Sequence, residues 1–250
     1  MKNKSILVPY VTAGFPAKKL FVPILKTLSN SGADFIEIGV PHSDPLADGP
    51  VIQYASKVAL DNGVNLNWIV EASRDLPLQK VKPLILFSYL NPILNYGFET
   101  LLKDLPKPLF YGLIIPDLPL EEAEKYLPLF KKSKLNLILL AAPTTKKEKI
   151  KKIAKNSTGF IYLVSVAGVT GIRKKLSSNL KQKIKEIKSY TNKPVVVGFG
   201  ISNTKQARKV ISFGADGIVI GSALIKVMSN TKDKEILKKI RHFVYSFKKQ

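Results

Sequence analysis

The stretch "DFIEIGVPHSDPLADGP" (residues 34–50) joins an apolar run to a loop crowded with Asp, Pro and Gly. The apolar half, "FIEIGV" (35–40), has the composition of a strand buried on both faces, as in a parallel sheet. Glu37 interrupts it, and an ionised carboxylate inside a barrel costs on the order of several kcal/mol unless it is paired or protonated. No Lys or Arg lies nearby in the sequence. We therefore expect Glu37 to be functional; the alternative is a strand-end Glu that faces solvent.

The loop after this strand carries two further candidate acids, Asp44 and Asp48. Acids that follow a strand directly are candidates for catalysis in α/β barrels, where the loops after the strands build the active site. The residues also fit a plain structural role, because Pro, Asp, Ser and Gly form turns and either Asp could cap a helix that starts near Val51. The loop by itself leaves both interpretations open.

Similar apolar runs recur along the whole chain, separated by amphipathic segments of helical spacing. Together with 35–40, the runs are 6–13, 83–88, 109–116, 135–142, 159–165, 194–200 and 217–222. Eight such units in 250 residues predict a single α/β domain over 1–250, a (β/α)8 TIM barrel of eight parallel strands. An open doubly wound sheet is the second possibility, but the first strand is not followed by a GxGxxG turn.

Composition excludes several classes of protein. No apolar run has the length of a transmembrane helix, and the N-terminus lacks a signal-peptide pattern, so we expect a soluble protein outside any membrane. The sequence has no Cys and two His, which argues against disulfides, a Cys nucleophile and a metal site. The net charge of +22 comes from lysines in segments such as "KKEKIKKIAKN", which are typical of solvated helix faces. Specific nucleic-acid binding is therefore not expected.

Glycines follow three consecutive late strands: "AGVTG" (167–171), "GFG" (198–200) and "GS" (221–222). Glycine lets the backbone approach an anion closely, and Ser222 can begin a helix whose free N–H groups face it. The late loops form the usual phosphate site of this fold. Because no P-loop motif is present, a phosphorylated small metabolite is the expected ligand.

The run "IEIGVPHSDPLADGP" resembles the signature of the tryptophan synthase alpha subunit family. The segments "VPYVTAGFP" (8–16), "YLNPILNYG" (89–97), "GLIIPDLPLEE" (112–122), "SVAGVTG" (165–171), "GFGIS" (198–202) and "GADGIVIGSALIK" (214–226) match the family in order. The resemblance implies a lyase that cleaves indole-3-glycerol phosphate to indole and glyceraldehyde 3-phosphate without metal or cofactor. It also implies an alpha2beta2 complex, in which a beta subunit with pyridoxal phosphate joins the indole to serine.

The resemblance assigns roles to matching positions. Glu37 becomes the acid–base group, Asp48 the group that stabilises the indole N–H, and Thr170 part of a loop that closes over substrate. The implied substrate-binding residues are Tyr10, Phe87, Tyr89, Ile114, Tyr162, Thr170, Gly171, Phe199, Gly200, Gly221 and Ser222. The implied interface with the beta subunit includes Asp44, Pro45, Asn91 and Pro119. For the aromatic residues, core packing is the competing interpretation.

Three positions depart from the family pattern: His42 replaces Phe or Tyr, Val166 a frequent Arg, and Tyr111 a common Asp. Few residues precede the first strand, which leaves little room for the helix that covers the barrel floor in many members, so we expect either lower stability there or a floor that is closed differently. Other phosphate-handling barrels of tryptophan or histidine biosynthesis place a catalytic Lys or Asp after strand one, where this chain has "YVTAG". A non-catalytic activating subunit would not need both Glu37 and Asp48. The expected location is the cytoplasm, or the plastid stroma if an organelle encodes the chain.

Overall fold

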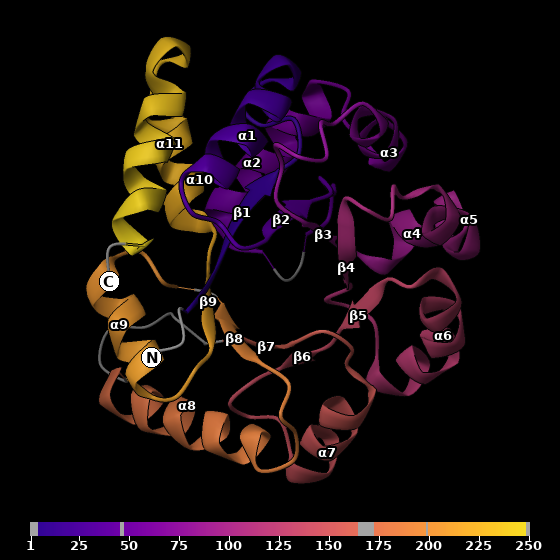
Figure 1. Cartoon of the computed structure of the whole chain (residues 1–250), viewed down its shortest axis with the longest axis vertical. Coiled ribbons are helices and arrows are strands. Elements are labelled where there is room, and N and C mark those ends of the chain that lie inside the picture. Colours follow the sequence, from indigo (N-terminus) through magenta and orange to yellow (C-terminus); the bar gives the residue numbers. More distant parts are fainter. Residues whose placement is uncertain (1–4, 46–47, 165–172, 199, 249–250) are drawn as a thin grey trace.

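The computed structural model describes residues 5–45, 48–164, 173–198 and 200–248, and the side chains of 173–178 and Asp233 are not described. A ring of parallel strands lies in the middle, and helices surround it (Figure 1). The strands are β1 (Ile6–Thr12), β2 (Ile36–Gly39), β3 (Leu84–Phe87), β4 (Phe110–Ile114), β5 (Asn136–Ile138), β6 (Leu140–Ala141), β7 (Ile161–Val164), β8 (Val195–Gly198) and β9 (Gly217–Ile220). The expected TIM barrel is confirmed.

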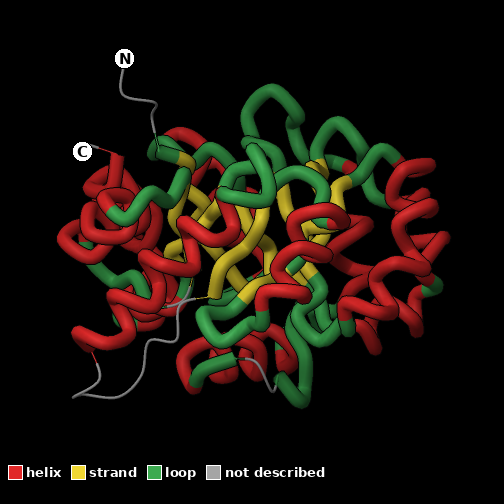
Figure 2. The backbone as a smooth tube through the Cα atoms, turned by 90° about the horizontal axis from the view of Figure 1, so that it is seen from below, coloured by secondary structure: helices red, strands yellow, loops and turns green. Residues whose placement is uncertain are grey.

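Helices follow the strands and cover the outside of the barrel, which is seen from the side in Figure 2. They are α1 (Phe21–Asn30), α2 (Pro50–Asp61), α3 (Leu66–Arg74), α4 (Leu90–Tyr96), α5 (Phe98–Asp104), α6 (Leu120–Ser133), α7 (Lys147–Asn156), α8 (Arg173–Lys188), α9 (Thr204–Ser212), α10 (Ser222–Ser229) and α11 (Asp233–Lys248), with a short 3-10 helix at Lys18–Leu20. The lysine-rich α7 buries Ile150, Ile153 and Ala154 on its inner face. Its lysines therefore lie on the solvated face, as the periodicity predicts.

The eight apolar runs form nine strands because the run 135–142 is divided at Leu139. Its first half, β5, pairs with β4, and its second half, β6, pairs with β7. The sheet order β5-β4-β3-β2-β1-β9-β8-β7-β6 therefore begins and ends on two halves of one bent run. The chain itself closes the barrel at this point.

The register of β1 and β2 places the acid of the opening stretch inside the barrel. Glu37 pairs with Tyr10 of β1 and with Ile85 of β3. Paired residues of neighbouring strands face the same side of a sheet, so Tyr10 and Glu37 point together into the interior. Glu37 is 2% exposed. The alternative of a solvent-facing Glu is wrong.

An aromatic cluster occupies the end of the barrel where the strands begin. The ring of Phe35, just before β2, lies 4.6 Å from the ring of Tyr111 in β4 and 6.2 Å from that of Phe160, just before β7. Because β2 and β7 lie on opposite sides of the sheet order, these rings meet across the interior. The barrel floor is thus packed with rings, and Tyr111 supplies one of them.

Candidate active site

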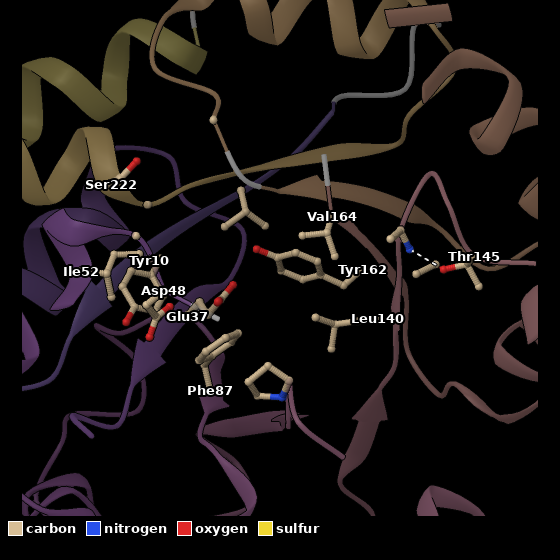
Figure 3. A pocket seen from close by; sticks show the side chains of 17 residues that line it. Tyr10, Glu37, Asp48, Ile52, Phe87, Leu140, Thr145, Tyr162, Val164 and Ser222 are labelled. Carbon is tan, nitrogen blue, oxygen red and sulfur yellow. Dashed lines mark hydrogen bonds between the residues drawn. The ribbon is translucent and has the colours of Figure 1, made fainter. Parts of the chain in front are cut away.

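A cavity of about 620 Å³ opens at the other end of the barrel, where the strands end. This is the end at which barrel enzymes carry their active sites. Its walls come from residues on or after nearly every strand (Figure 3). They are Tyr10, Glu37, Asp48, Gly49, Ile52, Phe87, Pro116, Leu140, Ala141, Ala142, Thr145, Tyr162, Val164, Gly200, Val219, Gly221 and Ser222.

Glu37 enters this cavity from β2 with one oxygen unsatisfied. Its Oε2 is buried and has no hydrogen-bond partner among the described residues. Burial first, and then the nearby Asp48 charge, raise the pKa of Glu37 to about 8. At neutral pH the side chain is therefore largely a neutral carboxylic acid, which removes most of the cost of burying it.

Asp48 lies in the same cavity but in a more polar environment. The hydroxyl of Tyr89 donates a hydrogen bond of 3.2 Å to its Oδ2. Burial raises the pKa of Asp48 to about 6, while the Tyr89 hydrogen bond acts to lower it. Two acids of one cavity thus differ in pKa, so that at neutral pH Glu37 holds a proton and Asp48 is largely ionised. Such a pair can divide acid–base and charge-stabilising roles.

Tyrosine and phenylalanine rings line the space beside the acids. The rings of Tyr10 and Phe87 meet edge to face at 5.9 Å, and Tyr162 extends into the middle of the cavity (Figure 3). Both tyrosines have their pKa raised well above the usual value, chiefly by burial. A Cβ on Gly39 would lie 2.1 Å from the Tyr10 hydroxyl, and one on Gly198 would lie 2.2 Å from that of Tyr162. Glycines at these two strand ends therefore make room for the rings.

The late loops bring small residues to the cavity, and Gly221 and Ser222 lie on the side of Tyr10 (Figure 3). Gly200, which follows β8, has a φ of +79°, a conformation that favours glycine. Gly221 precedes α10, and Ser222 begins that helix. All three line the cavity. Free N–H groups at the start of α10 can bind an anion there.

Some of the expected substrate residues do not line the cavity. Tyr89 is 5% exposed and reaches the site through Asp48, and Ile114 is fully buried in β4 beside Phe87. Thr170, Gly171 and Phe199 lie outside the described residues, as does Val166. The remaining expected residues, Tyr10, Phe87, Tyr162, Gly200, Gly221 and Ser222, share the cavity with both acids.

Residues expected at a partner interface lie on the rim at this same end. Asp44, Asn91 and Pro119 are exposed and Pro45 is half-buried; they follow β2, β3 and β4. Asn91 also lines a second, smaller hollow of about 370 Å³ together with His42. The ring of His42 lies 5.1 Å from the ring of Tyr89. His42 on the rim is therefore linked to Asp48 through Tyr89, by the ring contact and by the Tyr89 hydrogen bond.

Other residues of the cavity wall were not singled out from the sequence. Ile52, Leu140, Ala142, Thr145 and Val219 are the main examples. Most of them lie at or just after a strand end, which is the positional signal that could have indicated them. Their side chains are small, apolar or singly hydroxylated, so their chemistry gave no reason to select them.

In the part of the chain that the structure describes, no group of three or more His, Cys, Asp or Glu side chains is arranged to hold a metal ion. No described helix is long and apolar enough to cross a bilayer.

Fold and site together define a class: a parallel α/β barrel with two carboxyl groups of different pKa in a cavity at the end where barrel enzymes carry their active sites. The family model "Tryptophan synthase alpha chain" matches residues 1–250. The tryptophan synthase alpha chain of Prochlorococcus marinus subsp. pastoris is 44% identical over 247 residues, covering 99% of this chain and 88% of the relative. That of Arabidopsis thaliana is 42% identical over 248 residues, covering 99% and 90%.

A solved structure agrees with these relatives. The crystal structure of tryptophan synthase subunit alpha from Legionella pneumophila is 33% identical and superposes with a TM-score of 0.88, covering 98% of this chain and 92% of that one. This chain belongs to the tryptophan synthase alpha chain family. It is a carbon–carbon lyase of tryptophan biosynthesis, the subunit that cleaves indole-3-glycerol phosphate.

Proposed function

We propose that Glu37 performs both proton transfers in this cleavage, with Asp48 as the stabilising charge. The observation that carries the proposal is the buried, unpartnered Oε2 of Glu37, which faces a cavity shared with Asp48. A carboxyl group with a pKa of about 8 can give a proton near neutral pH and take one back. Intact acids of this kind argue against a subunit that only activates a partner.

In this mechanism Glu37 gives one proton and takes back another, so it ends each cycle in its starting form. The neutral Glu37 carboxyl gives its proton to C3 of the indole ring, and positive charge develops at the ring N–H. The Asp48 carboxylate accepts a hydrogen bond from that N–H and stabilises the charge. Glu37, now a carboxylate, takes the proton of the glycerol hydroxyl. As that oxygen becomes the aldehyde, the bond to C3 breaks, its electrons return to the ring, and Glu37 regains its acid form.

The rest of the cavity suits the two ends of the substrate. Tyr10, Phe87 and Tyr162 offer an apolar wall for the indole ring. Gly200, Gly221 and Ser222 offer backbone N–H groups for the phosphate. We assign Thr170, Gly171 and Phe199 to the same site from their sequence matches, with Thr170 in a loop that closes over substrate. Tyr89 and Ile114 contact residues of the cavity wall: Tyr89 donates a hydrogen bond to Asp48, and Ile114 lies beside Phe87.

The partner belongs to the proposal as well. We infer an alpha2beta2 complex with a beta subunit that carries pyridoxal phosphate, while this chain uses no cofactor of its own. The rim residues Asp44, Pro45, Asn91 and Pro119 are accessible beside the cavity, where a docked subunit would touch the loop that bears Asp48. We further propose that the protein binds no nucleic acid specifically and works in the cytoplasm or the plastid stroma.

Aldehyde release from indole-3-glycerol phosphate, measured with and without a beta subunit, tests this function. We expect slow cleavage by the chain alone and fast cleavage in the complex, because docking favours a closed arrangement of the loops. The variant Asp44→Ala should keep basal activity and lose part of the activation. No cleavage under either condition would refute the proposed function, and unchanged activation of Asp44→Ala would refute the interface assignment.

A further inference from the structure

Lys183 is a buried cation for which the proposed reaction has no use. In the described part of the chain, Glu37 at 2% and Lys183 at 9% are the least exposed charged residues. Burying the long side chain of a lysine restricts its rotamers and removes its charge from water, both at a cost in free energy. Lys183 lies on α8, outside the cavity wall, so its burial calls for a different explanation from that of Glu37.

The ammonium group of Lys183 donates a hydrogen bond to the main-chain turn that contains Thr145. Its Nζ donates a hydrogen bond of 2.7 Å to the carbonyl oxygen of Thr145. On the other side, Nζ pairs with Oε2 of Glu186, one helical turn further along α8, also at 2.7 Å. A charged donor makes the stronger kind of hydrogen bond, and Glu186 offsets the cost of burying the charge.

The turn that Lys183 holds is part of the cavity wall. Thr145 and Ala142 both line the cavity, in the connection between β6 and α7. The turn is closed by two bonds of its own: the Ala142 N–H donates to Thr145 Oγ1 at 2.8 Å, and the Thr145 N–H donates to the Ala142 carbonyl at 2.9 Å. These bonds make the turn a compact unit. Its contact with Lys183 ties that unit to α8.

The turn lies across the cavity from the two acids (Figure 3), so it can affect the binding of substrate more than the proton transfers. Figure 3 shows Thr145 on the side of the cavity away from Glu37 and Asp48, with Leu140 and Tyr162 between them. A shift of the turn would change the shape offered to bound substrate without moving either acid. We propose that Lys183 is a positioning residue, which sets the far wall of the cavity by holding the Thr145 carbonyl and thereby sets the affinity for substrate.

The inference rests on the proposed lyase function, and steady-state kinetics of the alpha–beta complex test it. In Lys183→Met we expect KM for indole-3-glycerol phosphate to rise by at least about tenfold, the scale of one lost charge-assisted hydrogen bond, with kcat within about twofold. Lys183→Arg keeps a charged donor and should restore most of the affinity. Lys181→Met, an exposed lysine of the same helix, is the matched control and should match the wild type.

A second variant separates the wall from the stability of the helix. Glu186→Gln removes the ion pair but leaves the bond to Thr145, so its KM should stay near the wild-type value. An unchanged KM in Lys183→Met, or equal KM increases in Lys183→Met and Glu186→Gln, would overturn the inference. If Lys183→Met does not fold, Lys183→Gln, which is too short to reach Thr145, carries the same expectation. A wild-type complex without lyase activity would instead refute the proposed function.

Discussion

Asp34 and Glu37 lie three residues apart on either side of the start of β2, yet they serve opposite ends of the barrel. Asp34 Oδ2 accepts hydrogen bonds from the Leu7 N–H at 2.8 Å and from Lys248 Nζ at 2.5 Å, and so ties α11 to β1. Glu37 has an oxygen with no partner among the described residues. An acid bonded to two distant segments holds the fold together, whereas a buried acid with an unpartnered oxygen at a cavity is available to a substrate.

The aromatic residues of the two ends differ in the same way. At the floor, the rings of Phe35, Tyr111 and Phe160 pack against one another. At the other end, Tyr10 and Tyr162 line a cavity, with glycine where each hydroxyl needs space. The barrel therefore separates stability from chemistry along its axis, as barrel enzymes generally do.

The largest effect should come from the acids of the cavity. Replacing Glu37 by Gln or Asp48 by Asn keeps the shape but removes a proton-transfer or charge-stabilising group, so the lyase rate should fall by at least about a hundredfold. Aldehyde release by each variant in complex with a beta subunit measures this, with circular dichroism as the control for folding. Near-normal turnover in either variant would contradict the assignment of chemistry to this end of the barrel.

Glu37 should also make stability depend on pH. Its pKa is about 8 in the folded state against an ordinary 4.5, so the folded state binds more protons between these values and loses stability as pH rises through that window. Glu37→Gln removes this loss and should be more stable than wild type by on the order of 4–5 kcal/mol at pH 9, and by little at pH 4.5. Urea denaturation at both pH values measures the difference; equal differences at the two values would contradict the assignment.

Tyr89→Phe should have a smaller effect that reports on Asp48. The Tyr89 hydrogen bond lowers the pKa of Asp48, so its loss should raise that pKa above about 6. Because the proposed reaction uses ionised Asp48, the acidic limb of the kcat/KM profile should move to higher pH, with a rate loss of about two- to tenfold at neutral pH. An acidic limb that stays in place would show that this limb does not report Asp48.

The smallest effect is expected at the floor end. Asp34→Asn keeps an acceptor for the Leu7 N–H but loses the ion pair with Lys248, so unfolding free energy should drop by about 1 kcal/mol while lyase activity stays unchanged. Glu122→Gln, in an exposed pair with Lys125, is the control and should leave stability unchanged. Loss of activity in Asp34→Asn would mean that the floor is not purely structural.

The sequence by itself determined the barrel, its site end and the two catalytic candidates. Eight apolar runs separated by helical patterns specify strands and crossovers through local periodicity. An acid within such a run can be recognised from the sequence alone. The order of the family motifs then specified the reaction. These properties reside in residues close together along the chain, so they can be recognised without coordinates.

Only the tertiary structure decided the contacts between distant segments. The division of the run 135–142 at Leu139 depends on two different neighbouring strands, and the bond from Tyr89 to Asp48 joins residues far apart in the sequence. The bond from Lys183 to Thr145 and the ring contacts of Tyr111 are of the same kind. A pKa, a cavity wall or an ion pair depends on what the fold brings within a few ångströms, and local pattern carries no record of those neighbours.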